Sequence, residues 1–307
     1  GNEVRTLRAR KEILLSAGAF QSPQILMLSG VGDAKALGQH GIPVIHHLPG
    51  VGQNLQDHPD FIFGYTTHSP ATFGFTAGGI WRALKATHTY RHKRRGLWTS
   101  NFAEAGAFVK TKPDLPAPDI QLHLVTALVD DHGRKLHFNQ GYSCHVCLLR
   151  PRSRGSVQLA GRDPEVAPLI DPAFLSDPQD LEDMVEAYKI TRRVMQSPSI
   201  ARWMEKDMFT QNVKSDEEIR QVLRERSDTV YHPVGSCKMG VDEMAVVDPQ
   251  LKVIGIEGLR IVDASIMPTL IAGNTNAPVM MIAEKAADMI KGKAVAGSTT
   301  LRSQTAE

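Results

Sequence analysis

The sequence has little of several features that often reveal a protein's class. Its 307 residues include only three cysteines, Cys144, Cys147 and Cys237, too few for a disulfide framework and typical of a reducing compartment. No apolar run approaches the roughly 18–20 residues that a membrane-spanning helix needs. The formal net charge is +2, so bulk attraction for nucleic acid is absent. We therefore expect a soluble, cytoplasmic, globular protein of one large domain or two ordinary ones.

A complete glycine-rich loop for a dinucleotide is also missing. Gly30-Val31-Gly32 and Gly50-Val51-Gly52 each supply two glycines, but neither is followed by the third. Neither lies in a strand-turn-helix unit with an acidic residue about 20 positions later. We interpret both segments as turns and helix ends.

The spacing of Cys144 and Cys147 could indicate a redox or zinc motif. However, residues 142–149 have the pattern of a strand, where side chains three positions apart point to opposite faces of the sheet. No second cysteine pair is present to complete a zinc site. We therefore predict that both cysteines are structural and that the chain holds no metal.

The order of sequence patterns predicts an α+β or α/β protein with an inserted domain. Residues 12–16 predict a buried strand, followed by a helix that Ser22 caps, that Pro23 opens and that Gly30 ends. Asp33 predicts the start of a second short helix that ends at Gly41. We assign residues 1–60 to part of one domain, which residues 231–292 complete with a strand at 259–263 and a helix from Pro278 to Ile290. Residues 293–307 are predicted to be a tail.

Residues 61–230 have a different pattern and predict an inserted domain. Strand-like segments are separated by Pro, Gly and Asp turns, and they cover residues 61–67, 104–109, 119–126, 142–149 and 155–159. One helix is clear, because Asp177 caps it, Pro178 opens it and Ser197-Pro198 ends it. We therefore expect an antiparallel sheet with helices, inserted between the two pieces of the first domain.

A basic run, Arg91-His92-Lys93-Arg94-Arg95, lies within this domain. Such a run is usually a solvated helix face. A peripheral contact with a membrane surface or a partner protein is the alternative.

His232 is the strongest catalytic candidate. It lies in Tyr231-His232-Pro233-Val234-Gly235, where a proline and a glycine restrict the backbone and can hold the side chain in one orientation. An imidazole titrates near neutrality and can accept a proton from an activated alcohol.

Asn274 is the second candidate, just before a predicted helix N-terminus. The free N–H groups of such a terminus stabilise negative charge. The pyrimidine end of a flavin becomes anionic when the ring accepts a hydride, so this terminus would stabilise the reduced form.

Three blocks of this sequence resemble the glucose-methanol-choline (GMC) family of flavin-dependent oxidoreductases. Residues 9–32 are similar to the family's second signature, and residues 48–58 are similar to its Pro-Gly-Val-Gly-x-Asn-Leu-x-Asp-His element. Residues 232–240 and 258–285 resemble its C-terminal active-site half. The resemblance is greatest to bacterial alcohol dehydrogenases that act on aliphatic primary alcohols, with choline dehydrogenases next.

The resemblance implies a mechanism and a set of site residues. It makes His232 the general base, with Asn274 as the partner that hydrogen-bonds the substrate oxygen, and it passes a hydride from the alcohol to FAD. It places seven further residues around FAD or its substrate: Ala17 and Gly18 near the adenosine half, Asp263 and Ala264 near the diphosphate and ribityl chain, Thr275 and Asn276 at the pyrimidine end, and Glu104 on the substrate-facing sheet. A quinone or an electron-transfer protein is expected as the electron acceptor in preference to oxygen, which would bring the enzyme to the membrane.

The resemblance begins just before the second signature, and the family's N-terminal glycine-loop half is absent. We therefore expect the chain to be the C-terminal portion of a longer enzyme, with an incomplete FAD-binding domain. Three functions stay open: an alcohol dehydrogenase, a choline dehydrogenase, and a non-catalytic remnant or one half of a split enzyme.

Overall fold

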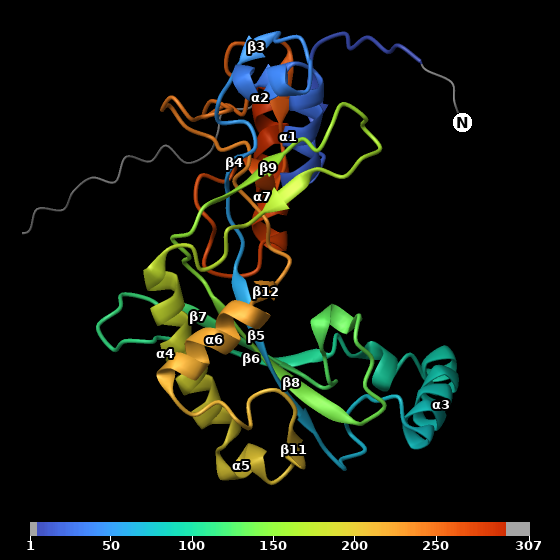
Figure 1. Ribbon diagram of the computed structural model, residues 1–307. Helices are drawn as coiled ribbons and strands as arrows, with labels where there is room; N and C mark the ends of the chain where they lie inside the picture. The colour runs from blue at the N-terminus through green and yellow to red at the C-terminus, as the bar shows by residue number, and fades with distance from the viewer. Residues whose placement is uncertain (1–4, 293–307) are drawn as a thin grey trace, which may run out of the picture.

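The computed structural model describes residues 5–292 and shows two packed units (Figure 1). The upper unit brings the blue N-terminal segment beside the red C-terminal segment, and the lower unit contains the large sheet. Each unit has its own hydrophobic core. The chain passes from the upper to the lower unit at the start of strand β5 (Pro59–Thr66) and returns to the upper unit for residues 155–171. It then builds the rest of the lower unit and leaves it after β12 (Asp228–Thr229).

The upper unit joins segments from opposite ends of the sequence. Strand β1 (Ile13–Leu15) pairs in parallel with β13 (Leu259–Ile261). Helices α1 (Gly18–Leu28) and α7 (Asn276–Ile290) pack with these strands around a common core. Leu26 of α1, Ile261 of β13 and Ala286 of α7 are all buried there.

Helix α1 begins earlier than the sequence patterns predict. Ser22-Pro23 was expected to open it, but the helix starts at Gly18 and Pro23 lies inside it. A proline at this position cannot donate to the carbonyl of Ala19. The Ser236 hydroxyl donates to that carbonyl instead, so a residue of the C-terminal segment compensates for the missing helix bond.

Short elements complete the upper unit. Helix α2 (Ala34–Gln39) is capped by Asp33 as predicted, and the parallel strands β2 (Val31–Gly32) and β3 (His46–His47) flank it. Strand β9 (Gly155–Gln158) was expected in the inserted sheet. It pairs instead with β4 (Gln53–Leu55) and β10 (Leu169–Asp171), because a close backbone contact between Gly52 and Val157 draws it to the upper unit.

The lower unit is built on a six-stranded antiparallel sheet. Its order is β11 (Lys206–Asp207), β5 (Pro59–Thr66), β8 (Gly141–Leu148), β7 (Ile120–Val125) and β6 (Ala103–Val109), with β12 (Asp228–Thr229) also paired to β5. One face of this sheet carries the apolar residues Phe61, Phe63, Ile120 and Leu122, all of which are buried.

Helices α4 (Pro178–Met195) and α6 (Asp216–Arg226) cover that apolar face. Helix α4 follows the predicted bounds, and Leu181, Met184 and Tyr188 point into the core at helical spacing. Helix α6 was not predicted, although Ser215 and Glu218 form a capping box at its start. The short helix α5 (Pro198–Ala201) follows α4.

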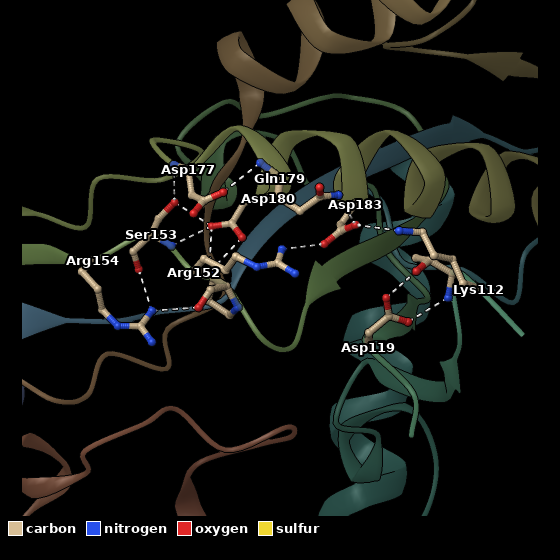
Figure 2. A network of polar contacts seen from close by, with 11 residues as sticks. Lys112, Asp119, Arg152, Ser153, Arg154, Asp177, Gln179, Asp180 and Asp183 are labelled. Carbon is tan, nitrogen blue, oxygen red and sulfur yellow. Dashed lines mark hydrogen bonds and ion pairs between the residues drawn. The ribbon is translucent and has the colours of Figure 1, made fainter. Parts of the chain in front are cut away.

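A polar network fastens the start of α4 to the loop that follows β8 (Figure 2). The Asp180 carboxylate is fully buried and accepts hydrogen bonds from the backbone N–H groups of Arg152 and Ser153 and from the Ser153 hydroxyl. Asp183, one turn later, pairs with the half-exposed Arg152 and Lys112 side chains. Asp180 therefore sets where α4 lies on the sheet.

Helix α3 (Ala77–Lys93) projects from the far side of the lower unit (Figure 1). The remaining short turns of helix are η1 (Leu97–Thr99), η2 (Asp131–Gly133) and η3 (Ala264–Ile266). Among the described residues, no helix combines the length and apolar character needed to cross a bilayer. The predicted tail at residues 293–307 lies outside the described residues.

Candidate active site

The backbone around His232 is held by one buried carboxylate. His232 lies in the loop after β12, next to Tyr231, which has a positive φ of 69°. The His232 N–H donates to Asp57 Oδ1 at 2.9 Å, and the His58 N–H donates to the same oxygen at 2.8 Å. The Thr229 hydroxyl donates to the other oxygen, Oδ2. Asp57 therefore places the two histidines side by side.

The hydrogen bonds between these histidines fix which ring nitrogen of His232 carries the proton. His58 Nε2 lies 3.0 Å from the Ile271 carbonyl oxygen, which can only accept, so Nε2 bears the hydrogen. In neutral His58, Nδ1 is then an acceptor. It lies 3.0 Å from His232 Nδ1, which must therefore donate. Neutral His232 is left with a lone pair on Nε2, the atom that a general base uses.

Asn274 stands in front of that lone pair. Its side-chain nitrogen Nδ2 lies 3.4 Å from His232 Nε2, a long contact. Gln121 Nε2 donates to Asn274 Oδ1 at 3.2 Å, which turns the Asn274 amide so that its NH₂ group faces the histidine. The structure thus brings together His232 and Asn274, the two catalytic candidates predicted from the sequence. It also shows that Gln121 orients the Asn274 amide.

Burial keeps both histidines in the neutral form. It lowers the pKa of His58 to about 4, with a further contribution from His232. Burial also lowers the pKa of His232; His123 adds to this effect, and Asp60 opposes it. At neutral pH the His232 imidazole is therefore uncharged, as a proton acceptor must be.

Burial makes the charged form of the Asp57 carboxyl group unfavourable. Burial raises its pKa to about 6, although the three hydrogen bonds from Thr229, His232 and His58 favour the charged form. Burial of this carboxylate therefore costs free energy, and the hydrogen bonds from its three partners hold it in place.

The polar face of the six-stranded sheet lies behind this pair. Strand register puts Asp60 opposite Cys147, and His123 opposite His145, on the face away from α4. Asp60 Oδ2 lies 2.6 Å from His145 Nδ1. Burial acts to lower the pKa of His145, but the charge of Asp60 and its hydrogen bond to the ring together outweigh burial, so the net shift of this pKa is upward. Cys144 packs into the core on the opposite face from Cys147, which confirms the predicted strand geometry.

The residues predicted near the adenosine and diphosphate of FAD form one junction between β1 and β13. Asp263 accepts from the Gly18 N–H at 3.0 Å and from the Ser22 hydroxyl, while Ala17 N–H donates to Ser22 Oγ at 3.1 Å. The Ala264 carbonyl accepts from the Gly235 N–H. The Asp263 carboxylate is thus already bonded within the protein, and it shapes the junction.

The residues predicted at the pyrimidine end of FAD open helix α7. The helix begins at Asn276, two residues before the predicted Pro278, and Thr275 provides no side-chain cap. Asn276 is exposed. Uncapped N–H groups directly after Asn274 and its His232 contact fit the anionic end of a reduced flavin.

Glu104 is not brought to the His232–Asn274 pair. It lies on the edge strand β6, at a register shift in the pairing with β7, and accepts a hydrogen bond from the Ser100 hydroxyl at 2.5 Å. The side chain is exposed. Its predicted substrate-facing role stays a prediction.

Sequence reasoning missed Asp57, His58 and Gln121. The first two lay within a motif that was used only to identify the family. Gln121 and His123 could have been noticed because they alternate with Ile120, Leu122 and Leu124 along a strand, which indicates a sheet with one polar face. Their partners lie far away in sequence, so no local pattern connects them to Asn274.

Comparison with known proteins identifies the family. Family models described as GMC oxidoreductase match residues 1–60 and residues 151–283. The chain is 47% identical over 283 residues to an alcohol dehydrogenase [acceptor] of Pseudomonas putida, covering 92% of this chain and 51% of the relative. It is 41% identical over 295 residues to an oxygen-dependent choline dehydrogenase of Escherichia coli O45:K1 (strain S88 / ExPEC), covering 96% and 52%. The chain thus spans about half the length of these relatives.

Solved structures agree with this assignment. Pyridoxine 4-oxidase from Mesorbium loti superposes with a TM-score of 0.78 at 28% identity, covering 92% of this chain and 52% of that one. A formate oxidase variant of Aspergillus oryzae RIB40, described with its FAD, gives 0.83 at 27% identity, covering 92% and 54%. The predicted fold class is confirmed, and FAD is the cofactor of these flavoproteins. The chain belongs to the GMC oxidoreductase family.

Proposed function

We propose that this chain carries the substrate-oxidising part of an FAD-dependent dehydrogenase that converts a primary, aliphatic alcohol to its aldehyde. The observation that carries the proposal is the unprotonated Nε2 of His232 beside the Asn274 amide. A lone pair and an N–H donor that face the same point can receive an alcohol hydroxyl group between them.

In this mechanism His232 Nε2 accepts the hydroxyl proton of the substrate. Asn274 Nδ2 donates a hydrogen bond to the substrate oxygen and stabilises its alkoxide character. When bound, FAD supplies the acceptor for the hydride that leaves the alcohol carbon. Thr275 and Asn276, at the start of α7, would hold the pyrimidine end of FAD, while Gln121 keeps the Asn274 amide in its orientation.

The similarity to the P. putida enzyme, named alcohol dehydrogenase [acceptor], supports an alcohol as the substrate and a separate electron acceptor, for which we propose a quinone or an electron-transfer protein. The second candidate is choline, which the similarity to the E. coli enzyme supports. Turnover of choline and of a medium-chain primary alcohol, measured on the same FAD-loaded preparation with an artificial electron acceptor, separates the two.

The first measurement is the visible spectrum of the purified protein that carries residues 1–307, after FAD is added and the excess removed. A retained, perturbed flavin band supports the proposal and permits the turnover assay. Absence of flavin even when the N-terminal half of a homologous enzyme is supplied would support the non-catalytic alternative.

The role of His232 is tested in the FAD-loaded protein by His232→Ala. Loss of the base is expected to lower turnover by about 10²–10⁴ while flavin is retained. His68→Ala removes a highly exposed histidine of the inserted domain and serves as the matched control. Near-full turnover of a flavin-containing His232→Ala protein would rule out the proposed role.

A further inference from the structure

Helix α3 presents an outward face that combines apolar and basic side chains. None of the residues of this helix is buried, and Ile80, Trp81 and Leu84 are 53%, 69% and 61% exposed. These three residues lie within one turn of each other, on one side of the helix. Lys85 and Arg91 flank the same side at helical spacing and are also exposed. The solvent-facing side of the helix therefore carries apolar and basic side chains together.

The opposite side of α3 carries less exposed residues of the helix, Gly79, Arg82, Ala83 and Ala86. Three of them, Gly79, Arg82 and Ala86, line a cavity together with Phe73, Gly74 and Leu97 of the sheet domain. The Trp98 indole N–H donates to the Thr87 hydroxyl at 2.9 Å and lies within hydrogen-bonding distance of the Ala83 carbonyl. Phe73 packs against Trp98 and against Phe102, next to strand β6. Because Gly79, Arg82, Ala83 and Ala86 face the domain, the Ile80–Trp81–Leu84 side is the outer side.

The charge of the surrounding segment is of one sign. Residues 61–103 contain six lysines and arginines and no aspartate or glutamate. The whole chain has a net charge of +2, so the remaining residues together carry −4. Four of the six bases, Arg91, Lys93, Arg94 and Arg95, cluster at the C-terminal end of α3 and are exposed. The segment is a cationic patch on an otherwise acidic chain.

We propose that this face of α3, comprising Ile80, Trp81, Leu84, Lys85 and residues 91–95, docks on an anionic lipid bilayer. Charge complementarity selects the partner, because each base near an anionic membrane surface contributes favourably and aromatic and apolar side chains enter the headgroup boundary. The helix lies on the bilayer without crossing it, because its inner side faces the sheet domain. A soluble acidic protein would match the charge of the bases but would provide no apolar environment for the Trp81 side chain.

The geometry also suggests what docking achieves. Helix α3 projects from the same domain whose polar sheet face supports Asn274 (Figure 1). Docking would hold that domain at the surface where long-chain alcohols and membrane quinones are concentrated. This second step rests on the proposed function, whereas the lipid contact itself does not.

Sedimentation with vesicles tests the contact on the purified protein that carries residues 1–307. Binding is expected to phosphatidylcholine vesicles that contain about one third phosphatidylglycerol, with little binding to phosphatidylcholine alone. Raising the salt concentration from about 0.1 M to about 0.5 M should release the protein, because the screening length falls. Trp81 fluorescence, recorded in a Trp98→Phe, Trp203→Phe background, should shift to the blue on binding.

Two variants with the same change in net charge locate the patch. Replacing Arg91, Lys93, Arg94 and Arg95 by glutamine should lower vesicle binding by about tenfold or more. Replacing four exposed bases elsewhere, Arg8, Lys35, Lys206 and Arg224, should leave at least half of the binding intact. Trp81→Ser with Leu84→Ser should abolish the apolar contribution while the sedimentation stays salt-sensitive.

Three results would overturn the proposal. Equal loss of binding in the two charge variants would show that only net charge matters. Binding to heparin or RNA without a shift of Trp81 fluorescence on vesicles would identify a polyanion as the partner. Burial of Trp81 without lipid, when the N-terminal half of the enzyme is present, would identify that half as the cover of this face.

Discussion

The two faces of the six-stranded sheet come from the same strands but differ in what they contact. On one face, Phe61, Phe63 and Ile120 are completely buried beneath α4 and α6. On the other, Asp60 pairs with His145, and Gln121 reaches the side chain of Asn274. The first face holds the domain together, and the second supports the residues proposed to carry out the chemistry.

This difference shows how strand alternation separates stability from reactivity. The apolar layer excludes water from one side of each strand, so the polar side chains on the other side are backed by a medium of low dielectric constant. This environment contributes to the shifted pKa values of His123 and His145. A slip of one residue in the register would exchange the two faces, so the pairing that builds the core also places the site.

The largest expected effect is that of Phe63→Ala, which tests the difference between the two faces of the sheet. Phe63 is fully buried and packs against Phe61 and Tyr188. Removal of the ring leaves a cavity, and the free energy of unfolding should fall by about 3–5 kcal/mol, measured by chemical denaturation. Ile62→Ala, the neighbouring residue on the other face, should cost about 1 kcal/mol. Equal losses for the two variants would contradict the division of roles.

The attachment of α4 to the apolar face is tested by Asp180→Ala. The change leaves the buried N–H groups of Arg152 and Ser153 without their acceptor, so the free energy of unfolding should fall by about 2–4 kcal/mol. Asp183→Ala removes only ion pairs with half-exposed bases and should cost about 1 kcal/mol or less. If Asp183→Ala lowered the free energy of unfolding more than Asp180→Ala, Asp183 would be the residue that anchors α4.

Asp57 and His58 make opposite contributions to the pH dependence of stability. The pKa of Asp57 is raised in the fold to about 6 from 3.8, so its contribution is complete below pH 3.8 and is lost as the pH rises through 6. The pKa of His58 is lowered to about 4 from 6.5, so its contribution is complete above pH 6.5 and is lost as the pH falls toward 4. Between pH 4 and pH 6 the two contributions to the free energy of unfolding change in opposite directions and largely cancel.

Asp57→Asn should separate these trends, because the amide oxygen can still accept from both backbone N–H groups. Relative to the unchanged protein, the variant should gain about 2–3 kcal/mol of stability between pH 4 and pH 7.5. Denaturant titrations at a series of pH values measure this gain. A constant difference between the two proteins across the range would mean that Asp57 keeps an ordinary pKa.

The smallest expected effect is on the tautomer of His232. His58→Leu removes the acceptor that holds the proton on His232 Nδ1, so nitrogen NMR should show a mixture of tautomers where the unchanged protein shows one. His58→Asn supplies an oxygen near the position of Nδ1 and should preserve the single tautomer. If His58→Leu has no effect on the ring nitrogens, another group orients His232.

Much of the fold could be predicted because its signals are local. Asp177-Pro178 marks the start of α4, and Asp33 marks the start of α2, since capping depends on residues only two or three positions apart. The strands β5, β6, β7 and β8 were also recognised from their composition. His232 and Asn274 were identified from a restricted backbone and a helix start, and both contribute to the observed cluster.

Helix α6 was missed despite its local capping box, whereas the other errors arose where the deciding partner is distant. The start of α1 depends on a hydroxyl group supplied by Ser236, and the placement of β9 depends on a contact with Gly52. His58 gains its importance from Ile271 and His232, on separate loops. Periodicity and propensity describe neighbours along the chain, so they carry no information about such pairs.

The parallel pairing of β1 with β13 has a consequence for the order of folding. Leu14 lies opposite Arg260, so the upper core cannot close until residues 259–261 have been synthesised. The lower sheet pairs strands that lie much closer in sequence, and loop closure for them costs less entropy. During translation the sheet domain can therefore form first, and the N-terminal segment must wait, unpaired, for its partner strand to emerge from the ribosome.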